Sequence, residues 1–226
     1  MTKLEQIVRS ASHPVALTGA GISAPSGIPT FQGAWKGRPI RDFLSRDFFR
    51  RRPLEFFELF CDMVAWCERD PNPAHLALAR MDIPVITQNI DTLHEKANTR
   101  CLYPLHGTLY TVRCPLCSHV ESASGFVSRL RPLYASRDNA ALSSAIRCPH
   151  CHSILDTDVV LYGDNVRFLT EAIQLAQNCD LMLVVGTSLT TYPAASLPDL
   201  ARKNGAKILT INDDCISAFT ENGIYA

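Results

Sequence analysis

Short, mainly apolar runs alternate along the chain with longer stretches in which apolar residues recur every three or four positions. The short runs are typical of strands buried in a parallel sheet, and the longer spacing is typical of helices packed against it. The apolar runs predict strands at residues 15–18, 84–87, 158–161, 181–185 and 207–211. The helical spacing predicts helices at residues 2–12, 167–178 and 194–204. This alternation indicates an α/β fold, with a parallel sheet covered by helices on both faces.

Two stretches interrupt the alternation. Residues 41–80 have a helical pattern rich in phenylalanine, with breaks at Pro53 and Pro71, and residues 109–155 contain four of the cysteines. We interpret both as parts of a smaller domain inserted into the parallel-sheet domain. The predicted sheet domain takes residues 1–34, 82–108 and 156–226, and the inserted domain takes residues 35–81 and 109–155.

Composition and charge narrow the class of protein. Hydrophobic residues make up 46% of the 226 residues and charged residues 19%, a balance that favours a buried core over disorder. Lysine plus arginine number 22, as do aspartate plus glutamate, so no net charge attracts nucleic acid or an anionic membrane. No apolar run is long enough to cross a membrane, and the first twelve residues lack a signal-peptide pattern. We expect a cytoplasmic protein with no nucleic-acid and no membrane partner.

Two Cys-x-x-Cys pairs account for four of the nine cysteines: Cys114 with Cys117, and Cys148 with Cys151. Each pair can direct two thiolates at one ion, and two pairs complete the tetrahedral four-sulfur shell that zinc prefers. A closed shell leaves no position for a reacting molecule, so we expect a structural zinc that stabilises a small module with little core of its own. The alternatives are reduced cysteines without metal and a redox pair.

A glycine turn follows the first predicted strand. Gly19, Gly21 and Ala24 match the G-x-G-x-x-G/A fingerprint, in which a tight turn and a helix N-terminus approach the pyrophosphate of a dinucleotide. A plain tight turn is the alternative. No acidic residue clearly ends a second strand about 20 residues later, as the dehydrogenase form of the motif requires, so hydride transfer is disfavoured.

Further motifs follow this turn in a fixed order. The turn continues as a Gly-Ile-Ser-Ala-Pro-Ser-Gly-Ile-Pro run, and later come Thr87-Gln-Asn-Ile-Asp91, His106-Gly107, Tyr162-Gly-Asp164, Gly186-Thr-Ser188 and Ile211-Asn212. This set, with the cysteine pairs between its members, resembles the sirtuin family from about residue 4 to residue 212. The resemblance implies a Rossmann-like NAD-binding domain and a small domain made of helices and a four-cysteine zinc module. It also implies an NAD-dependent protein lysine deacylase.

The resemblance further implies which residues hold NAD, a co-substrate in this family. The matching positions are Gly19, Ala20, Gly21, Ser23, Ile28, Phe31, Gln32, Gln88, Asn89, Ile90, Asp91, Gly186, Thr187, Ser188, Asn212 and Cys215. Among them, Ile28 and Asp91 would enclose the nicotinamide amide, and Phe31 would cover that pocket after cleavage. Cys215 would contact adenine through its backbone.

The same resemblance implies the chemistry. His106 corresponds to the general base that takes a proton from a ribose hydroxyl, and Asn89 and Asp91 complete the catalytic set. The implied products are free lysine, nicotinamide and O-acyl-ADP-ribose. The implied partner is an acylated lysine in an extended peptide, which would pair with a segment made of Val159, Val160, Leu161, Tyr162 and Gly163. For His106 the alternative is a structural histidine before a glycine. For residues 159–163 the alternative is an ordinary core strand.

Two departures from the family pattern refine these expectations. Gln32 stands where most sirtuins have an arginine, which predicts weaker NAD binding or compensation by Lys36 or Arg38. Phe57 and Phe60 stand where desuccinylase-type sirtuins have a Tyr-x-x-Arg pair, so we expect neutral acyl groups such as acetyl. The phenylalanines at positions 56, 57 and 60 line an acyl channel in one interpretation and form the small domain's own core in the other.

Two other functions remain open on the same residues. A mono-ADP-ribosyltransferase or NAD hydrolase would use the same scaffold, and a module that senses NAD or ADP-ribose would need no catalysis. The presence of Asn89, Asp91 and His106 together favours deacylation over both, because neither alternative requires the full set.

Overall fold

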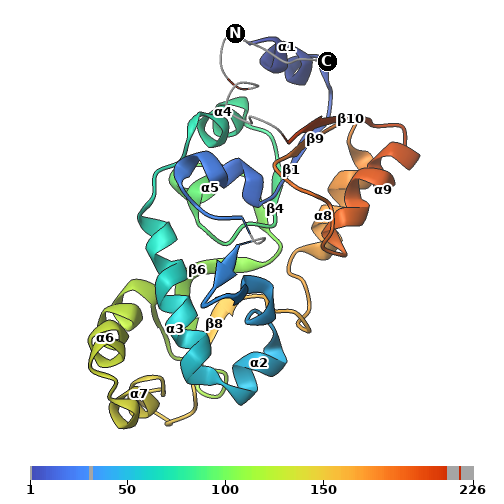
Figure 1. Cartoon of the computed structure of the whole chain (residues 1–226). Helices are drawn as coiled ribbons and strands as arrows, with labels where there is room; N and C mark the ends of the chain where they lie inside the picture. The colour runs from blue at the N-terminus through green and yellow to red at the C-terminus, as the bar shows by residue number, and fades with distance from the viewer. Residues whose placement is uncertain (1, 31–32, 213–218, 220–226) are drawn as a thin grey trace.

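The computed structural model describes residues 2–30, 33–212 and 219. Its largest sheet is parallel throughout and has the strand order β10-β9-β1-β4-β5 (Figure 1). The strands are β1 (Pro14–Thr18), β4 (Val85–Thr87), β5 (Leu102–Pro104), β9 (Leu181–Val185) and β10 (Lys207–Ile211). The chain extends the sheet from β1 in one direction through β4 and β5, then returns to add β9 and β10 on the other side. The strand order therefore reverses between β1 and β9.

Helices cover both faces of this sheet, because side chains along a buried strand point alternately to each face. Leu183 and Val185 face α1 (Lys3–Ser10) and α4 (Pro73–Met81). Met182 and Val184 face α8 (Leu169–Asn178) and α9 (Leu197–Lys203). In Figure 1, α8 and α9 lie on the opposite side of the strands from α4. The predicted α/β architecture is confirmed.

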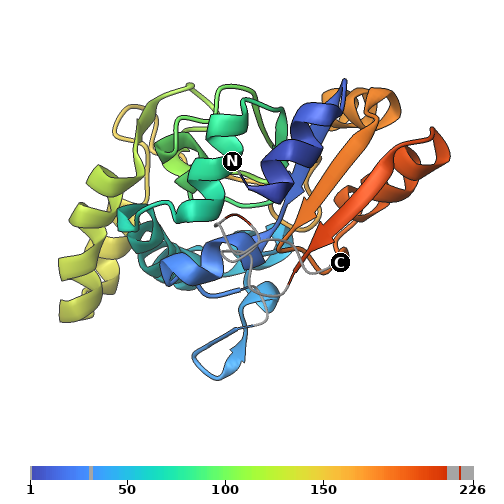
Figure 2. The same ribbon diagram turned by 90° about the horizontal axis from the view of Figure 1, so that it is seen from above.

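A second, smaller sheet is antiparallel and has the order β7-β6-β8. Its strands and the helices around it are β6 (Gly107–Arg113), β7 (Val120–Ser122), β8 (Asp156–Val159), α2 (Arg46–Arg51), α3 (Pro53–Val64), α6 (Ala123–Ser136) and α7 (Asn139–Ala145). Figure 2 shows α6 and α7, in yellow-green, at the end of the molecule opposite the orange and red strands β9 and β10. We call the part built on this sheet the small domain.

Short elements connect these parts. They are the hairpin strands β2 (Ala34–Trp35) and β3 (Arg38–Pro39), the four-residue helix α5 (Leu93–Lys96), and the 3₁₀ turns η1 (Ala20–Ser26), η2 (Ile40–Asp42), η3 (Ala65–Glu68) and η4 (Ala194–Ser196). No described helix is long and apolar enough to cross a membrane.

Aromatic rings form the core of the small domain. Phe56, Phe57 and Phe60 on α3 are fully buried, and Phe57 lies edge-on to Phe126 on α6 with the ring centres 5.0 Å apart. These rings contact one another and the neighbouring Phe49. The interpretation of this helix as core is confirmed, and the acyl-channel interpretation is wrong for these rings.

One strand prediction needs correction, and one strand of the parallel sheet was not predicted. Residues 158–161 were expected as a strand of the parallel sheet, but β8 ends at Val159 and pairs antiparallel with β6 in the small sheet. The fifth parallel strand is instead β5, whose residues are only half-buried and give a weak apolar signal. The predicted break at Pro53 is confirmed: α2 ends at Arg51, and Pro53 begins α3, a position where its missing N–H leaves no bond unmade. The boundaries of the two domains stay a prediction.

Candidate active site

The site residues expected from the sequence gather at the carboxyl ends of the parallel strands. The turn after β1, the loop after β4, the loop after β5 and the loop after β9 all begin there. In open α/β sheets, ligands bind at this edge where the strand order reverses. The reversal here falls between β1 and β9, so the turn after β1 and the loop after β9 lie side by side.

Glycines make the contact between these two loops possible. The amide of Gly21 donates to the carbonyl oxygen of Gly186 at 2.7 Å. A Cβ on Gly21 would lie 2.7 Å from that same oxygen, and one on Gly186 would lie 2.1 Å from the amide nitrogen of Ile22. Gly186 also has a φ of +62°, which side chains rarely adopt. The glycines of the fingerprint therefore have a packing role here in addition to the approach to phosphate expected for them.

The turn continues as η1, a 3₁₀ helix that contains Pro25, and not as the α-helix start that we expected. Its Ser23 is fully buried and forms the centre of a polar network. The Ser23 hydroxyl donates to Oδ2 of Asp91 at 2.6 Å and accepts from Nδ2 of Asn89 at 3.1 Å. Oδ1 of Asp91 accepts from the amide of Leu93 at 3.0 Å. Burial raises the pKa of Asp91, and these hydrogen bonds oppose that rise.

Asn89 presents an acceptor that the protein leaves unused. Its Nδ2 donates to the carbonyl oxygen of Gly19 at 3.2 Å as well as to Ser23. Its Oδ1 is buried and has no hydrogen-bond partner among the described residues. Because buried polar atoms are nearly always hydrogen-bonded, this oxygen is a candidate contact for a ligand hydroxyl.

His106 lies between β5 and β6 and is half-buried. Its Nδ1 is 2.9 Å from the carbonyl oxygen of Gln88, which can only accept, so the ring proton sits on Nδ1. Nε2 is then an unprotonated acceptor with no partner in the described part of the chain. Burial lowers the pKa of His106, and the bond to Gln88 partly offsets this, so the ring is neutral at pH 7. Gly107 after it has a φ of +75°, and a Cβ there would overlap the carbonyl oxygen of Asp158.

The remaining NAD-type positions lie around this network. Nε2 of Gln88 donates to the Thr187 hydroxyl at 2.9 Å, and the Thr187 amide donates to Oδ1 of Asn212 at 3.1 Å. Ser188 lies next to Thr187 in the same loop, and its hydroxyl is 3.0 Å from that of Thr190. Ile28 and Ile90 are buried, and Ala20 is half-buried. Phe31, Gln32 and Cys215 lie outside the described residues.

The segment expected to bind peptide leaves β8 and passes His106. The amide of Val160 donates to the carbonyl oxygen of His106 at 2.8 Å. Tyr162 is already paired on both backbone groups, with its amide on Leu44 and its carbonyl oxygen on Arg46. The side chains of Val159 and Leu161 are buried, and that of Tyr162 is 52% exposed. The side chains of Val159 and Leu161 thus belong to the core, Val160 is half-buried, and Tyr162 and Gly163 are exposed, so peptide binding by this segment stays a prediction.

The four paired cysteines come together in the small domain. The sulfurs of Cys114 and Cys151 are 3.3 Å apart, those of Cys117 and Cys148 are 3.4 Å apart, and all four lie within 4.8 Å of one another. Four sulfurs bound to one zinc ion at about 2.3 Å would be about 3.8 Å apart, within this range.

The two loops that carry these cysteines have the same backbone geometry. The amide of Cys114 donates to His119 at 2.7 Å, and that of Cys148 donates to Ser153 at 2.8 Å. A residue at φ +60° follows the second cysteine of each pair. The cluster is thus a closed tetrahedral donor set of the kind that zinc prefers.

Comparison with known proteins agrees with this geometry. A family model described as "Sir2 family" matches residues 19–193. The chain belongs to the Sir2 family. It is 40% identical over 221 residues to an "NAD-dependent protein deacylase 2" of Archaeoglobus fulgidus, with 93% of this chain and 83% of that one covered. It is 36% identical over 222 residues to an "NAD-dependent protein deacylase" of Pyrococcus furiosus, with 93% and 85% covered.

Solved structures of other Sir2-family proteins share the fold. "Structure of Sir2Tm bound to a propionylated peptide" matches with a TM-score of 0.80 and 32% identity, covering 93% of this chain and 85% of that one. "Sir2-p53 peptide-NAD+" matches with a TM-score of 0.81 and 30% identity, covering 96% and 94%. The fold and the family inferred from the motifs are therefore confirmed.

Two cations suggested as substitutes for an arginine at position 32 are engaged elsewhere in this sirtuin. Nζ of Lys36 lies 2.5 Å from Oε2 of Glu58, and the guanidinium of Arg38 lies 4.6 Å from the ring centre of Phe43. The pair with Lys36 also balances the charge of Glu58. Compensation for Gln32 by either cation stays a prediction.

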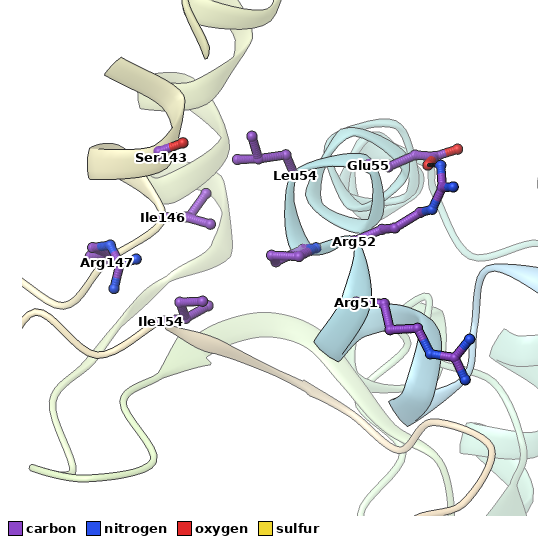
Figure 3. Close-up of a pocket in the computed structure, with 9 residues that line it drawn as sticks. Arg51, Arg52, Leu54, Glu55, Ser143, Ile146, Arg147 and Ile154 are labelled. Carbon is purple, nitrogen blue, oxygen red and sulfur yellow. Dashed lines mark hydrogen bonds and ion pairs between the residues drawn. The ribbon is translucent and has the colours of Figure 1, made fainter. Parts of the chain in front are cut away.

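A hollow of about 540 Å³ lies in the small domain of the sirtuin, between the start of α3 and α7 (Figure 3). It includes Arg51, Arg52 and Arg147, which are already bonded to Asp47, Glu55 and the His152 carbonyl oxygen, respectively. None of its lining residues belongs to the set at the carboxyl ends of the parallel strands. It is therefore separate from the candidate active site.

Sequence reasoning missed two buried residues next to the site. His75 on α4 and His94 on α5 are buried beneath η1, at 0% and 1% exposure, and contact Ser23 and Thr18. Each occupies an inward position of a helical pattern, where a histidine alone carries no functional signal. Only the three-dimensional arrangement brings them to the network.

Proposed function

We propose that this sirtuin is an NAD-dependent protein lysine deacylase that removes neutral acyl groups such as acetyl and yields nicotinamide and O-acyl-ADP-ribose. The observation that supports this most directly is the state of His106. Its proton is held on Nδ1 by the Gln88 carbonyl oxygen, so Nε2 is ready to accept a proton at the edge of the sheet where ligands bind. Relatives with the deacylase name cover nearly the whole chain.

The polar network fits NAD at the nicotinamide end. When bound, NAD supplies a ribose carbon that the acyl oxygen attacks as nicotinamide leaves. The buried carboxylate of Asp91 would accept an N–H of the nicotinamide amide, and the unpartnered Oδ1 of Asn89 would accept a ribose hydroxyl. Gly19, Gly21 and Gly186 keep the backbone at the phosphate end free of side chains.

His106 would perform the proton transfer. Nε2 takes a proton from a hydroxyl placed within hydrogen-bond reach, and the positive ring that results is stabilised through Nδ1–H on Gln88. Because its pKa lies below the ordinary value of 6.5, the base is already deprotonated at neutral pH and needs no prior activation.

An acylated lysine in an extended peptide is the proposed second substrate. The Val160 amide donates to the carbonyl oxygen of His106, so the segment proposed to bind the peptide lies directly beside the proposed base. Arg46 fixes the far end of this segment: Nε and Nη2 bind Asp164 at 2.9 and 2.7 Å, and Nη1 binds Asp156 at 2.8 Å. A rigid segment next to the base would hold the acyl group in place for attack.

We further propose that the four cysteines bind a structural zinc ion and that the protein works in the cytoplasm. The closed four-sulfur geometry supports the first proposal. The eight described cysteines are unpaired, as expected in a reducing compartment, which supports the second.

The test is product analysis by mass spectrometry after incubation with NAD and a peptide containing acetyl-lysine. We expect O-acetyl-ADP-ribose and its loss in His106→Ala, whereas His13→Ala, a change at an exposed histidine, should retain it. ADP-ribosylated protein or free ADP-ribose without the acetylated product would support the transferase or hydrolase instead. No turnover by wild type would leave NAD sensing as the function.

A further inference from the structure

Two buried histidines lie directly beneath the proposed nicotinamide pocket. The rings of His75 and His94 meet edge-on, with their centres 4.8 Å apart. Nε2 of His75 is 3.4 Å from the Ser23 hydroxyl, and Nε2 of His94 is 3.0 Å from the Thr18 hydroxyl. Neither residue has a role in the proposed reaction so far, although Ser23 donates to Asp91.

The hydrogen bonds of Ser23 decide which nitrogen of His75 carries the proton. A serine hydroxyl has one proton and two lone pairs. The proton goes to Asp91 at 2.6 Å, and one lone pair accepts from Asn89 at 3.1 Å. The contact with His75 can therefore be a hydrogen bond only if Nε2–H donates to the second lone pair. Nδ1 of His75 is then unprotonated, and it has no partner in the described part of the chain.

The same reasoning gives the position of the proton on His94, which contacts Thr18 at the end of β1. The Thr18 hydroxyl donates to that of Thr87 at 2.8 Å, so Nε2–H of His94 must be the donor to Thr18. Burial lowers the pKa of His75 to about 4 and lowers that of His94 as well. Both rings are neutral, and each has its proton on Nε2.

The position of His75 is fixed by its own helix. Asn72 caps α4 by accepting from the Ala74 amide at 3.0 Å, and its Nδ2 donates to the carbonyl oxygen of Ile22 at 2.7 Å. This clamp joins α4 to η1, so His75 and Ser23 are held at a constant separation. The contact between them is a built feature and not a chance approach of two surface groups.

We propose that His75 is a positioning residue for the nicotinamide site: its Nε2–H, together with Asn89, occupies both lone pairs of Ser23 and so reserves the Ser23 proton for Asp91. This inference rests on the proposed function, because it takes Asp91 as the acceptor of the nicotinamide amide. Without the His75 donor, Ser23 can rotate away, and the carboxylate loses the bond that keeps it aimed at the pocket.

The first test is direct binding of nicotinamide by titration calorimetry to wild type, His75→Leu and His75→Gln. We expect His75→Leu to weaken nicotinamide binding about five- to tenfold, the range expected for one neutral hydrogen bond. His75→Gln should restore it to within about twofold, since an amide N–H can replace Nε2–H. His94→Leu is the matched control: it removes an equally buried ring that bonds Thr18 and not Ser23, and it should leave nicotinamide affinity unchanged.

The second test needs no substitution. The long-range ¹H–¹⁵N spectrum of the imidazole groups should place the proton of both His75 and His94 on Nε2. A proton on Nδ1 of His75 would overturn the proposal, and so would unchanged nicotinamide affinity in a folded His75→Leu or equal losses in His75→Leu and His94→Leu. If wild type forms no O-acyl-ADP-ribose but binds nicotinamide with this pattern, the proposed function fails and the role of His75 stands.

Discussion

The contact between the two glycine loops can be tested with one methyl group. In Gly186→Ala the new Cβ would lie 2.1 Å from the Ile22 amide nitrogen and within 3 Å of backbone atoms of Gly21. These neighbours are backbone, so no side chain can rotate to make room. The substitution must therefore push η1 away from the loop after β9.

The expected cost has two parts. The φ of +62° at Gly186 costs an alanine about 1–2 kcal/mol of folding free energy, because its Cβ crowds the following carbonyl oxygen. Forcing an extra carbon into a packed region adds about 1–3 kcal/mol. The two parts predict a total loss of about 2–5 kcal/mol.

Gly37→Ala separates the two parts. Gly37 has a similar φ of +76°, but a Cβ there would meet nothing within 4 Å, so only the backbone cost of about 1–2 kcal/mol applies. The free energies of unfolding come from urea titrations of both variants and wild type. Gly186→Ala should also weaken NAD binding, and Gly37→Ala should not. Equal destabilisation by the two substitutions would refute the close approach of the loops.

Three further predictions follow from the site. His106→Ala should reduce the rate of deacylation at least about 100-fold, the usual contribution of a general base, with little change in melting temperature. Stability should fall below pH 6.5, because His75 and His94 stay neutral in the fold but bind protons when unfolded; each contributes up to about 1.4 kcal/mol per pH unit. A smaller pH dependence of the urea midpoint in His94→Gln would support this, and an identical one would contradict it. Cys148→Ser should abolish stoichiometric zinc in metal analysis and destabilise the small domain. A variant that keeps both its zinc and its stability would exclude a structural zinc role for this cysteine.

Much of the sheet could be predicted because burial leaves a strong pattern. The runs at Leu181–Val185 and Lys207–Ile211 form strands where the apolar residues predict them. β5 was not predicted, because Leu102–Pro104 is short and lies half-buried at the edge of the sheet, where the apolar pattern is weak. β8 was assigned to the wrong sheet, because an apolar strand looks the same whether its partner runs parallel or antiparallel.

Some residues of the candidate site could likewise be predicted from the sequence, and others could not. Residues at fixed spacing, such as the cysteine pairs and the glycine turn, were found because spacing along the chain carries their chemistry. His75 was not, because its role depends on where α4 lies against η1. The need for glycine at position 186 also could not be predicted from spacing, because a side chain there would meet the Ile22 amide in a loop that is far away in sequence.

The cysteine cluster has a consequence for catalysis although it is closed to substrate. β6 begins at Gly107, directly after His106, and ends at Arg113, directly before Cys114. Its partner β8 ends at Val159, directly before the residue whose amide binds the His106 carbonyl oxygen. His106, the proposed base, and the proposed peptide segment thus extend from one end of the same small sheet, and the loops with the paired cysteines lie at the other end. A metal ion there would restrain the strand that begins directly after His106 without taking part in the chemistry, which gives a closed four-sulfur site a physical connection to the proposed active site.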